Sequence, residues 1–178
     1  KRMKTNIALI GFMGTGKTAV GKVLAEKLSK EFIEMDALIE QKAGKPIPLI
    51  FQQDGEITFR ELEINLAKEI AQRKNLVIAC GGGIVLNKIN IDRLREESII
   101  VYLTALPDVI LRRVSGGQEI RPLLNVADKT SKIRELLQFR KPFYERAADI
   151  QIDASKLTIA SVAKQIIDKL KKNESLNF

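Results

Sequence analysis

Five short apolar segments alternate along the chain with longer segments in which apolar residues recur every three or four positions. The inner apolar segments are nearly continuous runs of Ile, Val and Leu, which is typical of strands buried on both faces. They predict five strands, at Asn6–Ile10, Glu31–Met35, Asn75–Cys80, Ser98–Leu103 and Asp149–Asp153.

The longer segments predict amphipathic helices. In Thr18–Ser29, the residues Val20, Leu24 and Leu28 form one apolar stripe. Similar stripes run through Phe59–Arg73, Ser131–Arg146 and Thr158–Lys172. Strands that alternate with helices predict an α/β fold, in which a parallel sheet is covered by helices on both faces. Without a linker or an internal repeat, we expect one domain over residues 1–178.

Composition narrows the possible chemistry. The chain has no histidine, which excludes mechanisms that need His as a base or metal ligand. Its one cysteine, Cys80, excludes an internal disulfide and is typical of a reducing compartment, so we expect a cytoplasmic protein. The apolar segment near the N-terminus is too short for a signal peptide, and no segment is long enough to span a membrane.

The net charge of +8 has two readings that the sequence leaves open: a solvated basic surface, or a site for small anions. Nucleic-acid binding is disfavoured, because the basic residues are dispersed and are not interleaved with aromatic residues. No exposed heptad or uncovered apolar stripe is evident, so we expect a monomer.

A glycine-rich loop stands between the first predicted strand and the first predicted helix. Its sequence, GFMGTGKT at Gly11–Thr18, matches the phosphate-binding pattern G-x-x-x-x-G-K-[ST] in the structural context that the pattern requires. Glycines let backbone N–H groups converge on phosphate oxygens, Lys17 reaches the β- and γ-phosphates, and the Thr18 hydroxyl ligates Mg²⁺. We therefore predict a site for a nucleoside triphosphate, formed by Gly14, Thr15, Gly16, Lys17, Thr18 and Ala19.

Two carboxylates, Glu34 and Asp36, lie at the end of the second predicted strand. The carboxyl ends of parallel strands form the ligand-binding edge of such sheets. A carboxylate there can accept a proton from a substrate hydroxyl or hold Mg²⁺. Asp36 is also well placed to cap the helix that begins with ALIEQK, and capping is compatible with catalysis.

Arg60 and Glu63 are three residues apart on a predicted helix, and so their side chains lie on the same face of it. One reading is an intrahelical ion pair, to which Glu56 adds a second acidic partner. The other is a guanidinium fork that binds a carboxylate of a ligand. Spacing alone leaves both open.

Three glycines, Gly81, Gly82 and Gly83, directly follow a buried strand. A turn needs one or two glycines, so three favour a ligand that lies against bare backbone over a merely flexible loop. The preceding Cys80 has no evident activating base, and we interpret it as a small buried apolar residue rather than a nucleophile.

Taken in order, the motifs resemble those of the shikimate kinases over essentially the whole chain. The phosphate-binding loop alone is shared by many kinases, but its combination with GE-x-x-FR-x-x-E and the triple glycine is far more specific. The motifs are GFMGTGKT, FIEMDALIE, GEITFRELE, GGGIV and RPLL…FRKPFYERAA. The resemblance implies a P-loop kinase fold with a five-stranded parallel sheet, and ATP-dependent phosphorylation of the 3-hydroxyl of shikimate on the way to chorismate.

The resemblance also implies residue roles. Asp36 binds the shikimate hydroxyls and acts as a base, while helices over about residues 36–73 hold the substrate. Arg60 and Arg140 hold the substrate carboxylate, and Glu63 assists Arg60. The backbone of Gly81, Gly82 and Gly83 contacts shikimate, above all at Gly82, and Phe51 and Phe59 line the pocket.

One position departs from the family pattern. The family usually has Asp-x-Asp at the end of the second strand, and the first Asp helps to hold Mg²⁺ through water. Here that residue is Glu34. Because Mg²⁺ demands strict geometry, the metal role of Glu34 is an open question.

A lid is expected over about residues 112–124, where two glycines precede Arg121 and Pro122. The resemblance places Arg121 against the phosphates, where it stabilises charge on the transferred phosphoryl group. It also places an arginine on the adenine ring, either Arg113 or its neighbour Arg112.

Three alternatives remain. A kinase of the same fold could act on gluconate or on a nucleotide, although two arginines for a carboxylate disfavour a nucleobase. A regulatory module would bind nucleotide without turnover, which leaves Asp36, Arg60 and the glycines unexplained. A nucleic-acid binder would show steeply salt-dependent affinity, but only the net charge supports it.

Overall fold

The computed structural model of the chain describes residues 2–115 and 129–173. Its centre is a sheet in which all neighbouring strands pair in parallel, as predicted. The order across the sheet is β2-β3-β1-β4-β5. The strands are β1 (Asn6–Ile10), β2 (Glu31–Glu34), β3 (Leu76–Ala79), β4 (Ser98–Thr104) and β5 (Ile150–Asp153). Each predicted strand is confirmed, with differences of one residue at most at either end.

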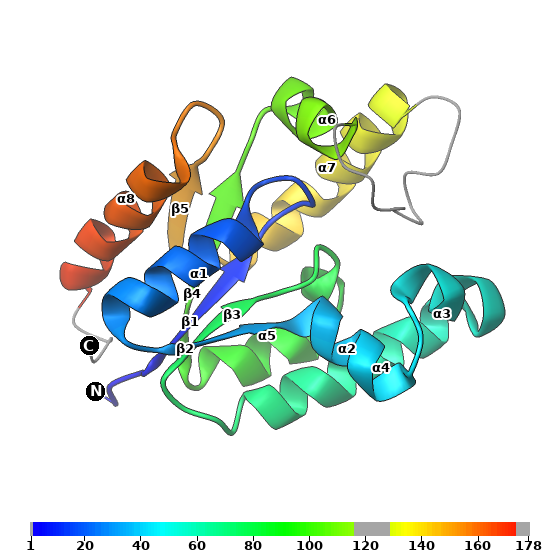
Figure 1. Cartoon of the computed structure of the whole chain (residues 1–178), viewed down its shortest axis with the longest axis horizontal. Coiled ribbons are helices and arrows are strands. Elements are labelled where there is room, and N and C mark those ends of the chain that lie inside the picture. The colour runs from blue at the N-terminus through cyan, green and yellow to red at the C-terminus, as the bar shows by residue number, and fades with distance from the viewer. Residues whose placement is uncertain (1, 116–128, 174–178) are drawn as a thin grey trace.

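Helices cover both faces of this sheet (Figure 1). They are α1 (Lys17–Leu28), α2 (Met35–Ala43), α3 (Ile47–Gln53), α4 (Gly55–Ile70), α5 (Lys88–Arg95), α6 (Pro107–Ser115), α7 (Lys129–Ala147) and α8 (Ile159–Lys171), with a short 3-10 helix η1 (Ile84–Leu86). The four stripes predicted α1, α4, α7 and α8. The apolar stripes did not predict α2, α3, α5 and α6. Of these, α2 was expected only from the capping argument at Asp36, and α3 and α5 have only seven and eight residues and bury few side chains. No helix in residues 2–115 and 129–173 is long and apolar enough to cross a membrane.

Alternation of side chains along the strands divides the core into two layers. In β1, Ile7 and Leu9 pack with α1 and α8 on one face, whereas Ala8 and Ile10 pack with α4, α5 and α7 on the other. Both sets are fully buried, which explains why the central strands read as continuous apolar runs.

A smaller apolar cluster supports the glycine-rich loop. Phe12, within that loop, packs with Ile110 and Val114 of α6 and with Ile133 of α7. Phe12 is only 1% exposed, so the loop is anchored by a buried aromatic side chain rather than standing clear of the domain.

Strand register brings three functional segments to one edge of the sheet. Leu9 of β1 is paired with Ala79 of β3, and Ala79 is paired with Glu34 of β2. The backbone N–H of Cys80 extends the β1–β3 ladder by donating to the Leu9 carbonyl at 3.0 Å. The glycine-rich loop, the start of α2 and the triple glycine therefore leave the sheet side by side.

Candidate active site

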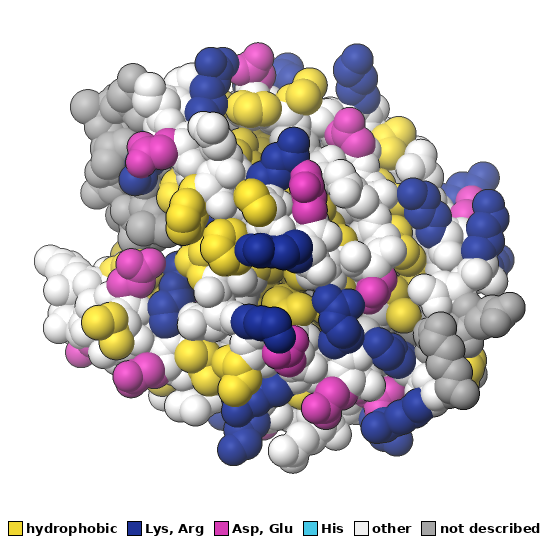
Figure 2. Space-filling view, turned by 180° about the vertical axis from the view of Figure 1, so that it is seen from behind, with side chains coloured by type: hydrophobic (Ala, Val, Ile, Leu, Met, Phe, Trp, Pro, Cys, Tyr) yellow, Lys and Arg dark blue, Asp and Glu magenta, His cyan; other side chains and the backbone are white. Residues whose placement is uncertain are grey.

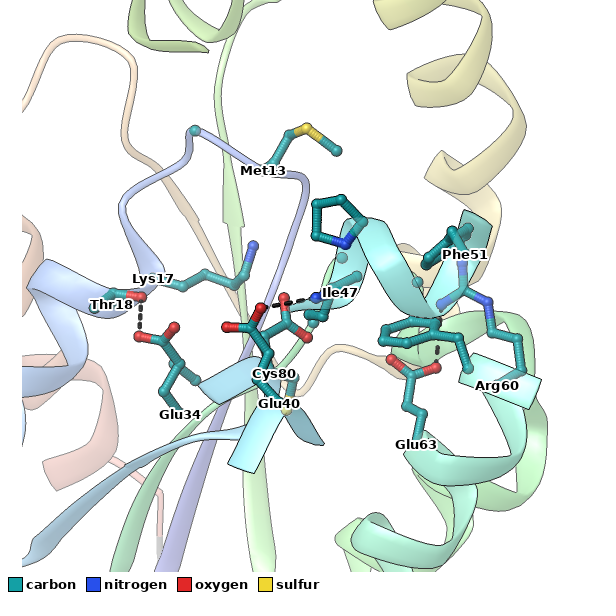
Figure 3. Close-up of a pocket in the computed structure, with 18 of the residues that line it drawn as sticks. Met13, Lys17, Thr18, Glu34, Glu40, Ile47, Phe51, Arg60, Glu63 and Cys80 are labelled. Atoms are coloured by element: carbon teal, nitrogen blue, oxygen red, sulfur yellow. Dashed lines mark hydrogen bonds and ion pairs between the residues drawn. The ribbon is translucent and has the colours of Figure 1, made fainter. Parts of the chain in front are cut away.

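One cavity of about 410 Å³ opens at this edge of the sheet. Figure 3 shows Lys17, Thr18 and Glu34 on one side of it and Phe51, Arg60 and Glu63 on the other. The structure thus brings the predicted phosphate-binding residues and the predicted acceptor-binding residues into a single space. The predicted residues among its lining are Gly14, Gly16, Lys17, Thr18, Ala19, Glu34, Asp36, Phe51, Phe59, Arg60, Glu63, Gly81, Gly82, Gly83 and Arg140.

The glycine-rich loop forms a tight turn that leads directly into α1. Gly14 and Gly16 have φ values of 79° and 95°, which side-chain-bearing residues rarely adopt. Between them, the buried Thr15 hydroxyl donates to the Phe12 carbonyl at 2.8 Å and braces the turn. Helix α1 begins right after Gly16 and has no side-chain cap, so its first N–H groups and its dipole are available to an anion.

Lys17 folds back over this loop. Its ammonium group donates to the Gly11 carbonyl at 2.7 Å and to the Phe12 carbonyl at 2.9 Å. The side chain borders the cavity, and so the charge that the motif assigns to the β- and γ-phosphates lies at the cavity wall.

Thr18 and Glu34 form the pair to which the sequence assigns the metal. The Thr18 hydroxyl donates to Glu34 Oε2 at 2.9 Å, across the gap between α1 and β2 (Figure 3). Both are oxygen ligands, which Mg²⁺ prefers, and the ion typically takes only one or two protein ligands beside phosphates and water. The described residues contain no group of three or more His, Cys, Asp or Glu side chains that could hold a metal ion. The extra methylene of Glu34 does not prevent its carboxylate from reaching Thr18.

Asp36 borders the cavity, but the predicted N-cap role is wrong. Helix α2 begins at Met35 with Glu34 as the N-cap residue, so Asp36 lies inside the first turn. The reason is that β2 passes directly into α2 without a connecting residue. A carboxylate in the first turn still interacts favourably with the helix dipole, and here it faces the triple glycine.

The triple glycine makes room for charged side chains. A Cβ on Gly83 would lie 2.3 Å from Nη1 of Arg60, and a Cβ on Gly81 would lie 2.7 Å from Oδ1 of Asp36. At Gly82 the nearest atom would be Nη1 of Arg140, at 3.4 Å. None of the three glycines has a φ in the left-handed region. Close approach of a charged side chain, not backbone freedom, is therefore what Gly81 and Gly83 require, whereas a Cβ at Gly82 would make only an ordinary contact.

Arg60 makes both ion pairs that its spacing predicted. It donates to Glu63 Oε1 at 3.2 Å and to Glu56 Oε1 at 3.3 Å. The same guanidinium borders the cavity and lies against Gly83, with 13% of its side chain exposed. The ion-pair reading and the ligand-binding reading are thus compatible in one geometry.

Glu63 is held in an unusual environment. Its side chain is 1% exposed, and Oε2 has no hydrogen-bond partner among the described residues. Burial raises the pKa of the Glu63 carboxyl from an ordinary 4.5 to about 7; Arg60 opposes this rise, and the nearby Asp36 adds to it. The cavity therefore contains a carboxyl group that gains or loses its proton near neutral pH.

Arg140 is a buried cation that makes no ion pair with the residues that the structure describes, although its charge acts on the nearby Glu63 carboxyl and lowers the pKa of that group. Only 3% of the residue is exposed, and no ion pair to it exists within the described residues. Its Nε has no hydrogen-bond partner there either, and its guanidinium carbon lies 5.7 Å from the ring centroid of Phe12. Because a buried unpaired charge is unfavourable, this environment favours an anion in the cavity.

Aromatic side chains form the wall near Arg60. The rings of Phe51 and Phe59 lie 4.9 Å apart, centroid to centroid, and the Arg60 guanidinium carbon is 5.1 Å from the centroid of Phe59. Both rings border the cavity, as predicted.

Sequence reasoning missed several residues of the site. Glu40 borders the cavity and accepts a hydrogen bond from the Ile47 N–H at 2.7 Å, which joins α2 to the start of α3. Its position one helical turn after Asp36 was the available signal. Tyr144, one turn after Arg140, donates to the Gly82 carbonyl at 2.5 Å.

Cys80 behaves as predicted. It is 2% exposed, and burial raises the pKa of its thiol to about 12. A thiol in this state is neutral and does not act as a nucleophile.

A second cavity, of about 250 Å³, lies next to the glycine-rich loop. Arg113 reaches across it, donating to the Gly14 carbonyl at 3.0 Å and to the Ala154 carbonyl at 3.1 Å. Both arginines are exposed, but Arg112 does not line this cavity. The remaining lining residues come from the glycine-rich loop, α1, the segment before α8 and α8 itself: Thr15, Gly16, Val20, Leu157, Ile159 and Val162. The predicted phosphate contact Arg121, and most of the predicted lid, lie outside the described residues.

Comparison with known proteins identifies close relatives. The family model described as shikimate kinase matches residues 13–171. A shikimate kinase from Caldanaerobacter subterraneus subsp. tengcongensis is 50% identical over 162 residues, which are 91% of this chain and 94% of that protein. One from Pelotomaculum thermopropionicum is 45% identical over 94% of this chain and 96% of that protein.

Solved structures agree with these matches. A shikimate kinase from Acinetobacter baumannii, in complex with shikimate, superposes with a TM-score of 0.91 at 38% identity and covers 96% of this chain and 95% of that one. A gluconokinase from Sinorhizobium meliloti gives a TM-score of 0.61 at 19% identity, over 97% of this chain and 94% of that one, which is a likeness of fold alone.

Proposed function

The chain belongs to the shikimate kinase family, and we propose that it transfers the γ-phosphoryl group of ATP to the 3-hydroxyl of shikimate. The products are ADP and shikimate 3-phosphate. The observation that supports the proposal is that one cavity is lined both by the glycine-rich loop and by two arginines, an aspartate and a triple glycine.

The donor half of the site is assigned to ATP. The loop residues Gly14, Thr15, Gly16, Lys17, Thr18 and Ala19 surround its phosphates, and Lys17 exchanges its two carbonyl partners for phosphate oxygens. Arg113 rather than Arg112 contacts the adenine ring, because Arg113 is the one that spans the second cavity beside the loop. The contact of Arg121 with the phosphates stays a prediction from the sequence.

Mg²⁺ belongs with ATP in this proposal. Thr18 and Glu34 are the residues that hold it, and the adjoining oxygens described above suit that ion. When bound, Mg²⁺ neutralises phosphate charge.

The acceptor half binds a hydroxylated carboxylic acid. Arg140 and Arg60 hold the carboxylate, since Arg140 makes no ion pair among the described residues and Arg60 is positioned by Glu63. Asp36 orients the 3-hydroxyl and accepts its proton as the oxygen attacks the γ-phosphorus in line. The backbone of Gly81, Gly82 and Gly83 lies against the ring, and Phe51 and Phe59 form its apolar wall.

The alternatives are weaker on specific grounds. Gluconokinases share the fold at low identity, whereas the high-identity relatives are shikimate kinases. Against a nucleic-acid binder, Figure 2 shows basic side chains interspersed with acidic ones on that face, not gathered in one patch. We also propose that the enzyme acts as a monomer and, since ATP is a cytoplasmic substrate, in the cytoplasm.

A coupled assay of ADP release tests the proposed function. We expect release from Mg²⁺-ATP with shikimate, and little with gluconate or a nucleoside monophosphate. Release with either of these instead would overturn the substrate assignment, and nucleotide binding without acceptor-dependent release would favour the regulatory alternative.

The variant Asp36→Asn tests the proposed base. It keeps the size of the side chain but removes the proton acceptor, so phosphoryl transfer should be lost while ATP affinity, measured by calorimetry, stays unchanged. Near-normal turnover in this variant would show that Asp36 neither orients nor deprotonates the hydroxyl.

A further inference from the structure

A buried tyrosine joins helix α7 to the triple glycine. The Tyr144 hydroxyl donates to the carbonyl of Gly82, the middle glycine, at 2.5 Å. Tyr144 itself is 0% exposed. It follows Arg140 by four residues, so both side chains project from the same face of α7. One face of α7 therefore carries both Arg140, which borders the cavity, and the Tyr144 hydroxyl, which is bonded to the triple glycine.

Packing alone does not require that hydroxyl. The Tyr144 ring stacks on the Tyr102 ring of β4 with centroids 4.9 Å apart and an interplanar angle of 24°. A phenylalanine ring would fill the same space. A buried hydroxyl is retained where it has partners. Here the partners are the Gly82 carbonyl, to which the hydroxyl donates, and the Arg140 side chain, whose charge and hydrogen bond lower the pKa of the phenol against the larger effect of burial. Burial raises the pKa of the phenol to about 12, so the group remains a donor throughout the neutral range.

Among the described residues, the other hydrogen bonds of this loop and η1 are short-range, and one of them runs from the Asn90 side chain of α5 to the Ile84 carbonyl at 3.2 Å. The Ile84 N–H donates to Gly81 and the Leu86 N–H donates to Gly83, each at 3.1 Å, and these bonds shape η1 without fixing its place in the domain. At its start, the loop is tied to β1 through Cys80. The hydrogen bond from Tyr144 holds the middle glycine of the triplet to α7. Around this triplet, the side chains of Asp36, Arg60 and Arg140 each lie next to a different glycine.

We propose that Tyr144 is a positioning residue for the acceptor, which fixes the triple glycine relative to Arg140 so that backbone and guanidinium meet the same substrate molecule. This inference rests on the proposed function, because it assigns the cavity to a carboxylate acceptor. It predicts that loss of the hydroxyl weakens acceptor binding, leaves nucleotide binding nearly unchanged, and lowers the stability of the fold by no more than the loss of one hydrogen bond.

The test compares Tyr144→Phe with Tyr102→Phe, which removes the other hydroxyl of the stacked pair. We expect KM for shikimate to rise about three- to tenfold in Tyr144→Phe, the range for one lost hydrogen bond. KM for ATP and the melting temperature should stay within about twofold and about 3 °C of wild type. Tyr102→Phe should match the wild type throughout. A wild-type KM for shikimate in Tyr144→Phe, or an equal rise in both variants, would overturn the proposal.

Amide hydrogen exchange separates this proposal from the proposed function. In the ligand-free protein, exchange at Ile84 and Leu86 should be faster in Tyr144→Phe than in Tyr102→Phe, because the loop has lost its central tie. If wild-type protein does not phosphorylate shikimate, the proposed function fails and exchange alone decides the positioning role. Equal protection of the two amides in both variants would then refute it.

Discussion

The substitution Gly83→Ala tests the idea that the triple glycine makes room for charged groups. The backbone at Gly83 has a φ of −97°, which alanine adopts without strain. The added methyl group, however, would lie 2.3 Å from Arg60 Nη1 and 2.7 Å from its Cζ and Nη2. The guanidinium has to move back by roughly 1 Å to regain ordinary contact.

That displacement has a calculable consequence for the acceptor. A charge-assisted hydrogen bond contributes about 1.5–3 kcal/mol, which corresponds to a factor on the order of ten to a hundred in affinity. Arg60 is a flexible side chain at the cavity wall, so its movement does not disturb the core. We therefore expect KM for shikimate to rise by that factor, with KM for ATP within about twofold and the melting temperature within about 3 °C of wild type.

Gly82→Ala is the matched control. Its methyl group would lie 3.4 Å from Arg140 Nη1 and farther from every other atom, at the close end of ordinary contact. Because Gly82 also lies in the proposed acceptor site, its variant measures the effect of a methyl group near shikimate without displacement of Arg60. Titrations of shikimate in the coupled ADP assay should show a larger rise in KM for Gly83→Ala than for Gly82→Ala, and an equal or opposite ranking would refute the steric argument.

Three further predictions concern other residues of the site. Because the pKa of Glu63 is raised on folding from 4.5 to about 7, its protonated form stabilises the native state at low pH and this stabilisation is lost as the pH rises. Between pH 4.5 and about pH 7, the free energy of unfolding of the wild type, measured with urea, should therefore fall by on the order of 3 kcal/mol relative to that of Glu63→Gln. A difference between the two proteins that does not change with pH would contradict a raised pKa for this carboxyl. Arg113→Ala should raise KM for ATP about tenfold, whereas the exposed Arg112→Ala should leave it unchanged; equal effects would refute the assignment. Glu34→Gln should weaken Mg²⁺-ATP binding in calorimetry and spare metal-free ATP binding, and a loss of both would argue against a metal role.

Local patterns in the sequence were enough to predict the sheet and the phosphate-binding loop. Continuous apolar runs arise wherever a strand is buried on both faces, and the glycine positions of the loop follow from its positive φ values. The helix at α3 was missed because its seven residues contain a proline and bury only Ile50. The supposed cap at Asp36 was wrong because nothing local reveals that β2 and α2 join without a connecting residue.

The sequence predicted which residues belong to the acceptor site, but not how they are arranged in it. Spacing gave the Arg60–Glu63 pair, and the family resemblance gave Arg140, but neither indicates that each glycine of the triplet faces a different charged side chain. Such contacts join α2, α4 and α7 to one loop, and depend on tertiary packing. Tyr144 shows the same limit, since only the folded chain brings its hydroxyl to Gly82.

The pairing of Leu9 with Ala79 sets a limit on how this enzyme can be redesigned. The donor loop follows β1 and the acceptor loop follows β3, so the two are spaced by neighbouring strands of one sheet, about 4.8 Å apart. An engineer cannot widen that interval for a larger acceptor without breaking the sheet. New specificity has to come from the side chains of α2, α3 and α4, which stand together at the right of Figure 1. Libraries directed at those helices, with the strands left untouched, are the economical route to kinases for other hydroxy-acids.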